Sequence, residues 1–155
     1  MVKKGVRVFL DSNVILSGLF SDTGSPRIIL DIISLNLPII QALTGRYNII
    51  EIERNLKKKM PSAISVYNDY LPKLNLEIIS MPSTAAIKNL SGHTSDKDIP
   101  VLASAITGKA DFLVTGDKRD FGKLRIKGGY PFKIVSPSEF LEDILPEILK
   151  SADTE

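Results

Sequence analysis

The sequence has no cysteine, and this absence excludes several kinds of chemistry. A chain without cysteine forms no disulfides, has no thiolate nucleophile and offers no cysteine ligands for zinc or iron–sulfur sites. Only one histidine is present, His93, so a His-ligated zinc site or a Ser-His-Asp triad would have to be built on that residue. We therefore interpret His93 as a loop residue and expect any metal to be bound by oxygen, which favours Mg²⁺ or Mn²⁺.

The sequence also lacks a strong excess of charge and long apolar runs. The formal net charge is +2, which by itself does not indicate a polyanionic partner. No apolar run reaches the roughly 20 residues that a membrane helix needs. The basic start leads into an apolar run of about five residues, shorter than the roughly 7–15 of a secretory signal. We expect a cytoplasmic protein with no membrane contact.

The composition that is present is typical of an ordinary globular domain. The chain has 155 residues, of which 43% are hydrophobic and 25% charged, so it can bury a sizeable core. We expect one domain over residues 1–145 and a C-terminal extension over 146–155. The patterns predict strands at 6–10, 38–43, 74–79, 111–115 and 132–135, and helical segments at 14–20, 26–35, 47–60, 62–71, 85–90, 99–106 and 136–145. Because strands alternate with helices, we expect an α/β fold with a parallel sheet.

Two of the expected strands end in acids. Asp11 follows the apolar run 6–10, and Asp117 follows the strand at 111–115. Ligands of open parallel sheets bind beyond the carboxyl ends of the strands, so these are favourable places for a site. Two further acids are candidates: Asp98 opens a helix rich in small residues, and Glu51 lies within an otherwise apolar helix.

A cluster of these four acids would indicate a metal site. Carboxylates packed together raise one another's pKa values, and a divalent cation relieves the repulsion. Mg²⁺ and Mn²⁺ prefer oxygen ligands, acidify a bound water and stabilise developing negative charge, which suits phosphodiester hydrolysis. Each acid also has an ordinary structural interpretation. Asp11 and Asp98 could cap helices, Glu51 could face solvent, and Asp117 could form an Asx-turn.

Four segments of the chain resemble a PIN-domain nuclease, and the resemblance extends from about residue 6 to residue 140. The segments are Phe9-Leu10-Asp11-Ser12-Asn13-Val14, Glu51-Ile52-Glu53-Arg54-Asn55-Leu56, Asp96-Lys97-Asp98 with the helix that follows, and Ala110-Asp111-Phe112-Leu113-Val114-Thr115-Gly116-Asp117-Lys118. The resemblance implies a single-domain three-layer α/β/α sandwich with a central, mostly parallel sheet. It also implies metal-assisted cleavage of RNA, usually leaving a 3′-hydroxyl and a 5′-phosphate.

The resemblance also implies roles for individual residues. Asp11, Glu51, Asp98 and Asp117 would form the acidic set, with Asp11, Asp98 and Asp117 binding the metal directly or through water. Asn13 and Thr115 would support the set, and Asp120 would act through water. Glu53 competes with Glu51, which we prefer because Leu56 matches a leucine of the family. Asp96 competes with Asp98, which we prefer because it opens the helix.

The chain departs from the family pattern at two places. Ser12 stands where threonine is common. Thr44-Gly45 follows the second strand where the family has a serine, and this leaves the register around Glu51 open by about one turn.

Basic residues follow two of the acids and could hold RNA phosphates. The proposed contacts are Arg54 and Lys57 after Glu51, and Lys118 and Arg119 after Asp117; the alternative is that these are solvated lysines and arginines. PIN proteins include the toxins of toxin–antitoxin pairs and often form dimers, so an antitoxin partner and a homodimer are expected. One alternative is a PIN-like RNA- or protein-binding scaffold without turnover. A receiver-like regulatory domain is disfavoured, because the first strand is not preceded by an acid pair.

Overall fold

The computed structural model describes residues 5–117, 121 and 130–153. Its centre is a five-stranded sheet in the order β3-β2-β1-β4-β5. The strands are β1 (Val6–Leu10), β2 (Ile40–Gly45), β3 (Glu77–Ile79), β4 (Phe112–Val114) and β5 (Lys133–Val135). All four pairings between these strands are parallel, which confirms the expected fold class.

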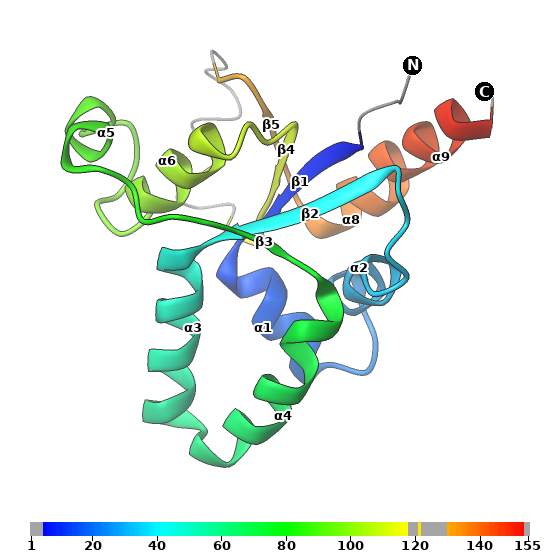
Figure 1. Cartoon of the computed structure of the whole chain (residues 1–155), viewed down its shortest axis with the longest axis horizontal. Helices are drawn as coiled ribbons and strands as arrows, with labels where there is room; N and C mark the ends of the chain where they lie inside the picture. Colours follow the sequence, from blue (N-terminus) through cyan, green and yellow to red (C-terminus); the bar gives the residue numbers. More distant parts are fainter. Residues whose placement is uncertain (1–4, 118–120, 122–129, 154–155) are drawn as a thin grey trace.

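Helices cover both faces of the sheet (Figure 1). One face carries α1 (Ser12–Phe20), α2 (Ser25–Ile33), α3 (Arg46–Lys59) and α4 (Ile64–Tyr70), together with α8 (Pro137–Glu139) and α9 (Leu145–Asp153). The opposite face carries α6 (Ile99–Thr107), with α5 (Thr84–Asn89) beyond it. The molecule is therefore the three-layer sandwich that the resemblance implied.

The two faces of the sheet follow from the alternation of side chains along each strand. In β1, Val8 and Leu10 belong to the core under α1 to α4, whereas Phe9 belongs to the core under α6. In β4, Val114 and Leu113 divide in the same way. Because both faces are buried, the central strands are continuous apolar runs in the sequence.

Several element boundaries differ from the sequence-based expectation. Strand β2 lies two residues later than expected, and β3 keeps only the last three residues of the segment at 74–79, because Leu71–Leu74 (η2) forms a 3₁₀ turn. Helix α2 begins at Ser25, one residue before the expected segment, and its capping position is taken by Gly24, whose φ of 97° is accessible mainly to glycine. Pro61–Ala63 (η1) is a 3₁₀ turn before α4.

The C-terminal helices are continuous with the domain. α8 is followed by a π-helical segment, Phe140–Ile144 (η3), and then by α9. A wider turn before Pro146 is reasonable because proline has no N–H to donate to the residue four positions earlier. Leu145 and Ile148 of α9 lie in the larger core, so the segment that we expected as an extension begins inside a packed helix. Within the described residues, no helix has both the length and the apolar character needed to cross a bilayer.

Candidate active site

The carboxyl ends of β1 and β4 lie side by side and bring two polar residues together. Leu10 is paired with Val114 in the sheet, so Asp11 and Thr115 follow neighbouring positions. The backbone N–H of Asp11 donates to the carbonyl of Val114 at 3.0 Å. The strand order reverses direction between β1 and β4, which is where open α/β sheets form their binding crevices.

Asp11 is held by hydrogen bonds from three neutral groups. Its Oδ2 accepts from the Thr115 hydroxyl at 2.7 Å. Its Oδ1 accepts from the Ser12 N–H at 2.8 Å and from the Asn48 Nδ2 at 3.2 Å. The bond from Ser12 makes Asp11 the N-cap of α1, so its structural interpretation as a cap is also correct. The carboxylate is therefore fixed in orientation while its charge stays unpaired within this set of contacts.

Two further bonds hold the turn that follows β4. The Thr115 hydroxyl accepts from the backbone N–H of Asp117 at 3.0 Å, and Asn13 Oδ1 accepts from the N–H of Gly116 at 3.0 Å. The Thr115 hydroxyl therefore helps to hold the segment between β4 and Asp117 in place. Asn13 and Thr115 thus connect the start of α1 to the segment that carries Asp117.

The charge on Asp11 is destabilised by its surroundings. The residue is 5% exposed, and its burial raises the pKa of the carboxyl group to about 6, an effect that the bonds from Thr115 and Ser12 partly offset. The carboxylates of Glu51 and Asp117 also contribute to this rise. Glu51 and Asp117 therefore lie close enough to repel the carboxylate of Asp11.

The sequence left two choices between neighbouring acids, Glu51 or Glu53 and Asp96 or Asp98, and the contacts of these residues differ. Glu53 accepts a hydrogen bond from the Tyr67 hydroxyl at 3.3 Å and so faces α4. The charge of Glu51 instead raises the pKa values of Asp11 and Tyr47. This geometry favours Glu51.

Asp98 and Asp96 differ in the same way. Asp98 is buried at 7% exposure and accepts from the Ser95 hydroxyl at 2.7 Å, whereas Asp96 is exposed. Although Asp98 occupies the capping position of α6, its side chain makes no capping bond. Tyr47 lies between the acids: its hydroxyl donates to the Lys97 carbonyl at 3.1 Å, and its pKa is raised by burial and then by Glu51 and Asp98.

The chemical type of these side chains suits a hard divalent cation. The donors are carboxylate, hydroxyl and amide oxygens, and the buried Asn48 Oδ1 has no hydrogen-bond partner in the described structure. However, among the described residues no three acidic or histidine side chains form a cluster tight enough to hold a metal. The acids form a looser group around Asp11, and Asp120 lies outside the described residues.

Sequence reasoning missed Asn48 and Thr44. Asn48 Nδ2 donates to the Ser12 hydroxyl at 2.8 Å as well as to Asp11, and the Thr44 hydroxyl donates to the carbonyl of Leu10 at 2.7 Å. Thr44 lies near the end of β2 and Asn48 lies in the first turn of α3, so both stand at the carboxyl end of this strand, where ligands of open parallel sheets bind. Gly45 is required between them, because a Cβ there would lie 2.8 Å from Asn48 Oδ1 and 2.9 Å from Ser104 Oγ.

The candidate RNA contacts divide between different sides of α3. Arg54 is exposed, and its charge lowers the pKa of Tyr47, so it lies on the side of the acids. Lys57 lines a cavity of about 230 Å³ with Glu53 and Tyr67, on the side that faces α4. Lys118 and Arg119 lie outside the described residues. His93 is in an exposed loop, where its Nδ1 is 2.6 Å from the Tyr130 hydroxyl.

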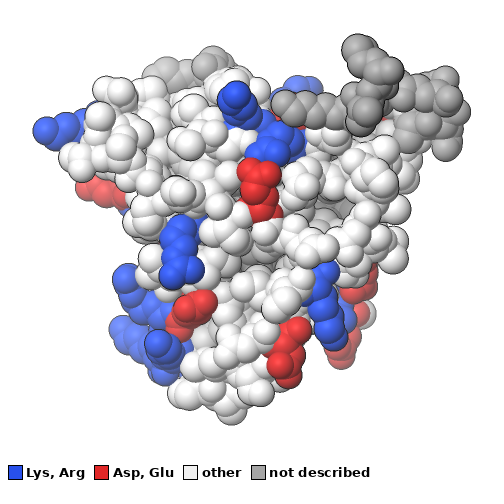
Figure 2. Space-filling view, in the orientation of Figure 1, with Lys and Arg blue, Asp and Glu red and all other residues white. Residues whose placement is uncertain are grey.

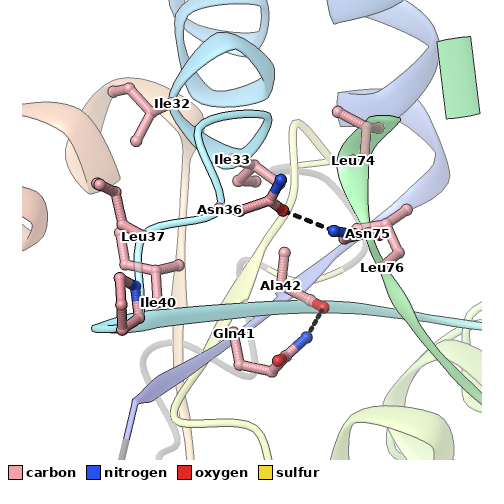
Figure 3. A pocket seen from close by; sticks show the side chains of 11 residues that line it. Ile32, Ile33, Asn36, Leu37, Ile40, Gln41, Ala42, Leu74, Asn75 and Leu76 are labelled. Atoms are coloured by element: carbon pink, nitrogen blue, oxygen red, sulfur yellow. Dashed lines mark hydrogen bonds between the residues drawn. The ribbon is translucent and has the colours of Figure 1, made fainter. Parts of the chain in front are cut away.

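A second cavity lies at the amino ends of β2 and β3, away from the acids (Figure 3). It has a volume of about 440 Å³, and its lining includes Ile33, Ala42 and Leu74 but no charged residue. Its polar groups include Asn36 and Asn75, which are joined by a bond of 2.9 Å from Asn75 Nδ2 to Asn36 Oδ1. A phosphate would find no cation there, so the acids around Asp11 remain the candidate site.

Three solved structures with a similar fold contain VapBC or FitAB bound to DNA. VapBC2 from Rickettsia felis bound to a promoter DNA fragment matches with a TM-score of 0.65 and 17% identity, covering 84% of this chain and 98% of that one. DNA-bound VapBC from Salmonella typhimurium matches with a TM-score of 0.62 and 14% identity over 85% and 98% of the two chains. FitAB bound to the IR36 DNA fragment matches with a TM-score of 0.57 and 16% identity over 84% and 94%.

These likenesses establish the fold, and the family follows from the sequence. No curated protein matches the chain. The family model of the PIN domain matches residues 7–119, which include β4 and the acids Asp11, Glu51, Asp98 and Asp117. The chain therefore belongs to the PIN-domain family of nucleases.

Proposed function

We propose that the chain is a Mg²⁺- or Mn²⁺-dependent endoribonuclease. The observation that supports this most is Asp11, a buried carboxylate at the end of β1 whose pKa is raised to about 6 by burial and by neighbouring acids. An anion in such a place is stabilised by a divalent cation, which when bound would acidify a water and stabilise negative charge on a phosphate.

The proposal gives each acid a role. Asp11, Asp98 and Asp117 hold the ion, directly or through water, and Glu51 completes the catalytic set. Thr115 and Asn13 orient Asp11 and the turn before Asp117 through the bonds described above. Asp120 acts through water. Arg54, Lys118 and Arg119 contact the phosphates of the RNA. Lys57 lines the cavity that faces α4, so we do not include it among these contacts.

Replacement of Asp11 by asparagine tests the nuclease directly. The Asp11→Asn variant keeps the size of the side chain but removes its charge, so we expect loss of cleavage of single-stranded RNA in Mn²⁺, by at least about 100-fold. Gel analysis of a labelled RNA gives the rate and the product ends. Glu53→Gln is the matched control and should keep full activity. Wild-type rates in Asp11→Asn, or equal loss in Glu53→Gln, would contradict the assignment.

We further propose that this nuclease is the toxin of a cytoplasmic toxin–antitoxin pair and acts as a homodimer. The support is that the similar structures are VapBC and FitAB complexes bound to DNA. Expression of the wild-type chain alone in a bacterial host should arrest growth, whereas Asp11→Asn at the same protein level should not. Equal growth of both strains, with active soluble protein in the wild-type cells, would sink the toxin proposal.

A second candidate is a PIN-like scaffold that binds RNA or protein without turnover. The observation that favours it is the loose spacing of the acids among the described residues. Titration with Mn²⁺ separates the two candidates. The nuclease should bind the ion with a measurable heat and cleave RNA, whereas a scaffold should do neither at millimolar Mn²⁺.

A further inference from the structure

Four side chains recur at helical spacing along one side of α3. They are Tyr47, Glu51, Arg54 and Lys58, which we call the Tyr47 row. Residues three, four and seven positions apart lie on the same side of a helix. The row runs from the acids around Asp11 toward the C-terminal end of α3.

The electrostatic environment of Tyr47 connects the row to the candidate site. Its pKa is raised by burial, Glu51, Asp98 and Asp11, and lowered by Arg54. All of these groups therefore lie within reach of one tyrosine ring. Arg54 is the cation of the row nearest to the acids, and Lys58 stands one turn further, about 6 Å along the helix axis.

The other basic side of α3 has different surroundings. Lys57 lines the cavity between α3 and α4 together with Glu53 and Tyr67, so an acid already stands beside it. Lys57 follows Arg54 by three positions, but it lies roughly a third of a turn around the helix axis from Glu51. The two neighbouring lysines, Lys57 and Lys58, therefore lie on different sides of α3.

The cations of the row are available for an external anion. Arg54 and Lys58 are exposed, and neither forms an ion pair within the described part of the chain. Figure 2 shows Lys and Arg side chains gathered over α3, at the lower left of the view. Because solvated cations beside an acidic site attract a polyanion, this side of α3 offers a path for phosphates.

We propose that single-stranded RNA leaves the acids along the Tyr47 row, with successive phosphates at Arg54 and Lys58. The proposal rests on the proposed function, since it takes RNA as the substrate. It specifies which side of α3 the strand follows: the Glu51 side, and not the side that faces α4.

Binding of RNA in the absence of cleavage tests this path. Fluorescence anisotropy of a labelled single-stranded RNA is measured in EDTA at several salt concentrations, with the full chain. Lys58→Gln should weaken binding roughly three- to tenfold and lower the salt slope by about 0.7, the value for one phosphate contact on a single strand. Lys57→Gln, its matched neighbour, should lose less than twofold, and Lys73→Gln, an exposed lysine in η2, should bind as the wild type does.

The outcomes separate the path from the nuclease. A loss in Lys57→Gln equal to or greater than that in Lys58→Gln overturns the path, and so does a wild-type protein that fails to bind RNA. Weaker RNA binding in Lys58→Gln alone supports the path. If the wild type also cleaves no RNA with any added metal, the nuclease proposal is wrong while the path still holds. If Lys58→Gln binds and cleaves RNA as the wild type does, the path is wrong and the nuclease proposal is unaffected.

Discussion

The Asp11 carboxyl group couples the candidate site to the stability of the fold. Its pKa is about 6 in the folded protein and 3.8 in the unfolded chain. Between these values the folded protein holds a proton that the unfolded chain has released. The contribution of Asp11 to stability is therefore complete below about pH 4 and is lost as the pH rises through 6.

The Asp11→Asn variant should remove this pH dependence. In EDTA, the wild type should lose about 2–3 kcal/mol of unfolding free energy relative to the variant between pH 4 and pH 8. This figure follows from about 1.36 kcal/mol for each unit of pKa shift. Urea denaturation at both pH values measures the change. Saturating Mn²⁺ at pH 8 should stabilise the wild type more than the variant. Parallel pH profiles for the two proteins would show that burial does not destabilise this carboxylate.

At the scale of elements, helix α3 is joined to the end of β1 through one amide. Asn48 Nδ2 donates to both Asp11 and Ser12 from a fully buried position. Gly45, the last residue of β2, lets the helix start close enough for this contact. The junction between β2 and α3 therefore determines how the side chain of Glu51 approaches Asp11.

Replacement of Asn48 tests this junction. Asn48→Ala removes two buried hydrogen bonds, one of them to a carboxylate, so the free energy of unfolding should fall by about 1–3 kcal/mol. Thermal or urea denaturation measures the loss. Asn55→Ala, on the same helix and only partly buried, should change stability by no more than about 0.5 kcal/mol. An equal effect of the two replacements would mean that Asn48 does not anchor the helix.

The sequence predicted the elements best where periodicity and length agreed. Strand β1 was predicted at its observed bounds, and α3 and α6 within one residue, because apolar runs and proline or glycine signals marked them. The short strand β3 was overestimated, since a 3₁₀ turn and a strand share the same apolar spacing over a few residues. Asn48 was missed because its importance depends on contacts with residues 36 and 37 positions earlier in the chain.

At the scale of the whole molecule, the fold class and the family were predictable and are confirmed. The acids Asp11 and Asp117 follow strands β1 and β4, and the strand-end rule placed them near one another before any coordinates. The rule could not give the distances between the carboxylates, because these depend on side-chain rotamers and on residues outside the described ranges. The metal, the RNA and the assignment of site residues therefore stay proposals.

The order of the strands has a consequence for the growing chain on the ribosome. β1 is made first, but the hydroxyl that holds Asp11 comes from Thr115 after β4, 104 positions later. The neighbours of β1 in the sheet are thus synthesised far apart in time, with β2 early and β4 late. Until β4 emerges from the exit tunnel, the segment that carries Thr115 cannot cover Asp11, and its carboxyl group stays exposed to water. A nascent chain of this protein therefore carries its main acid long before that acid is buried.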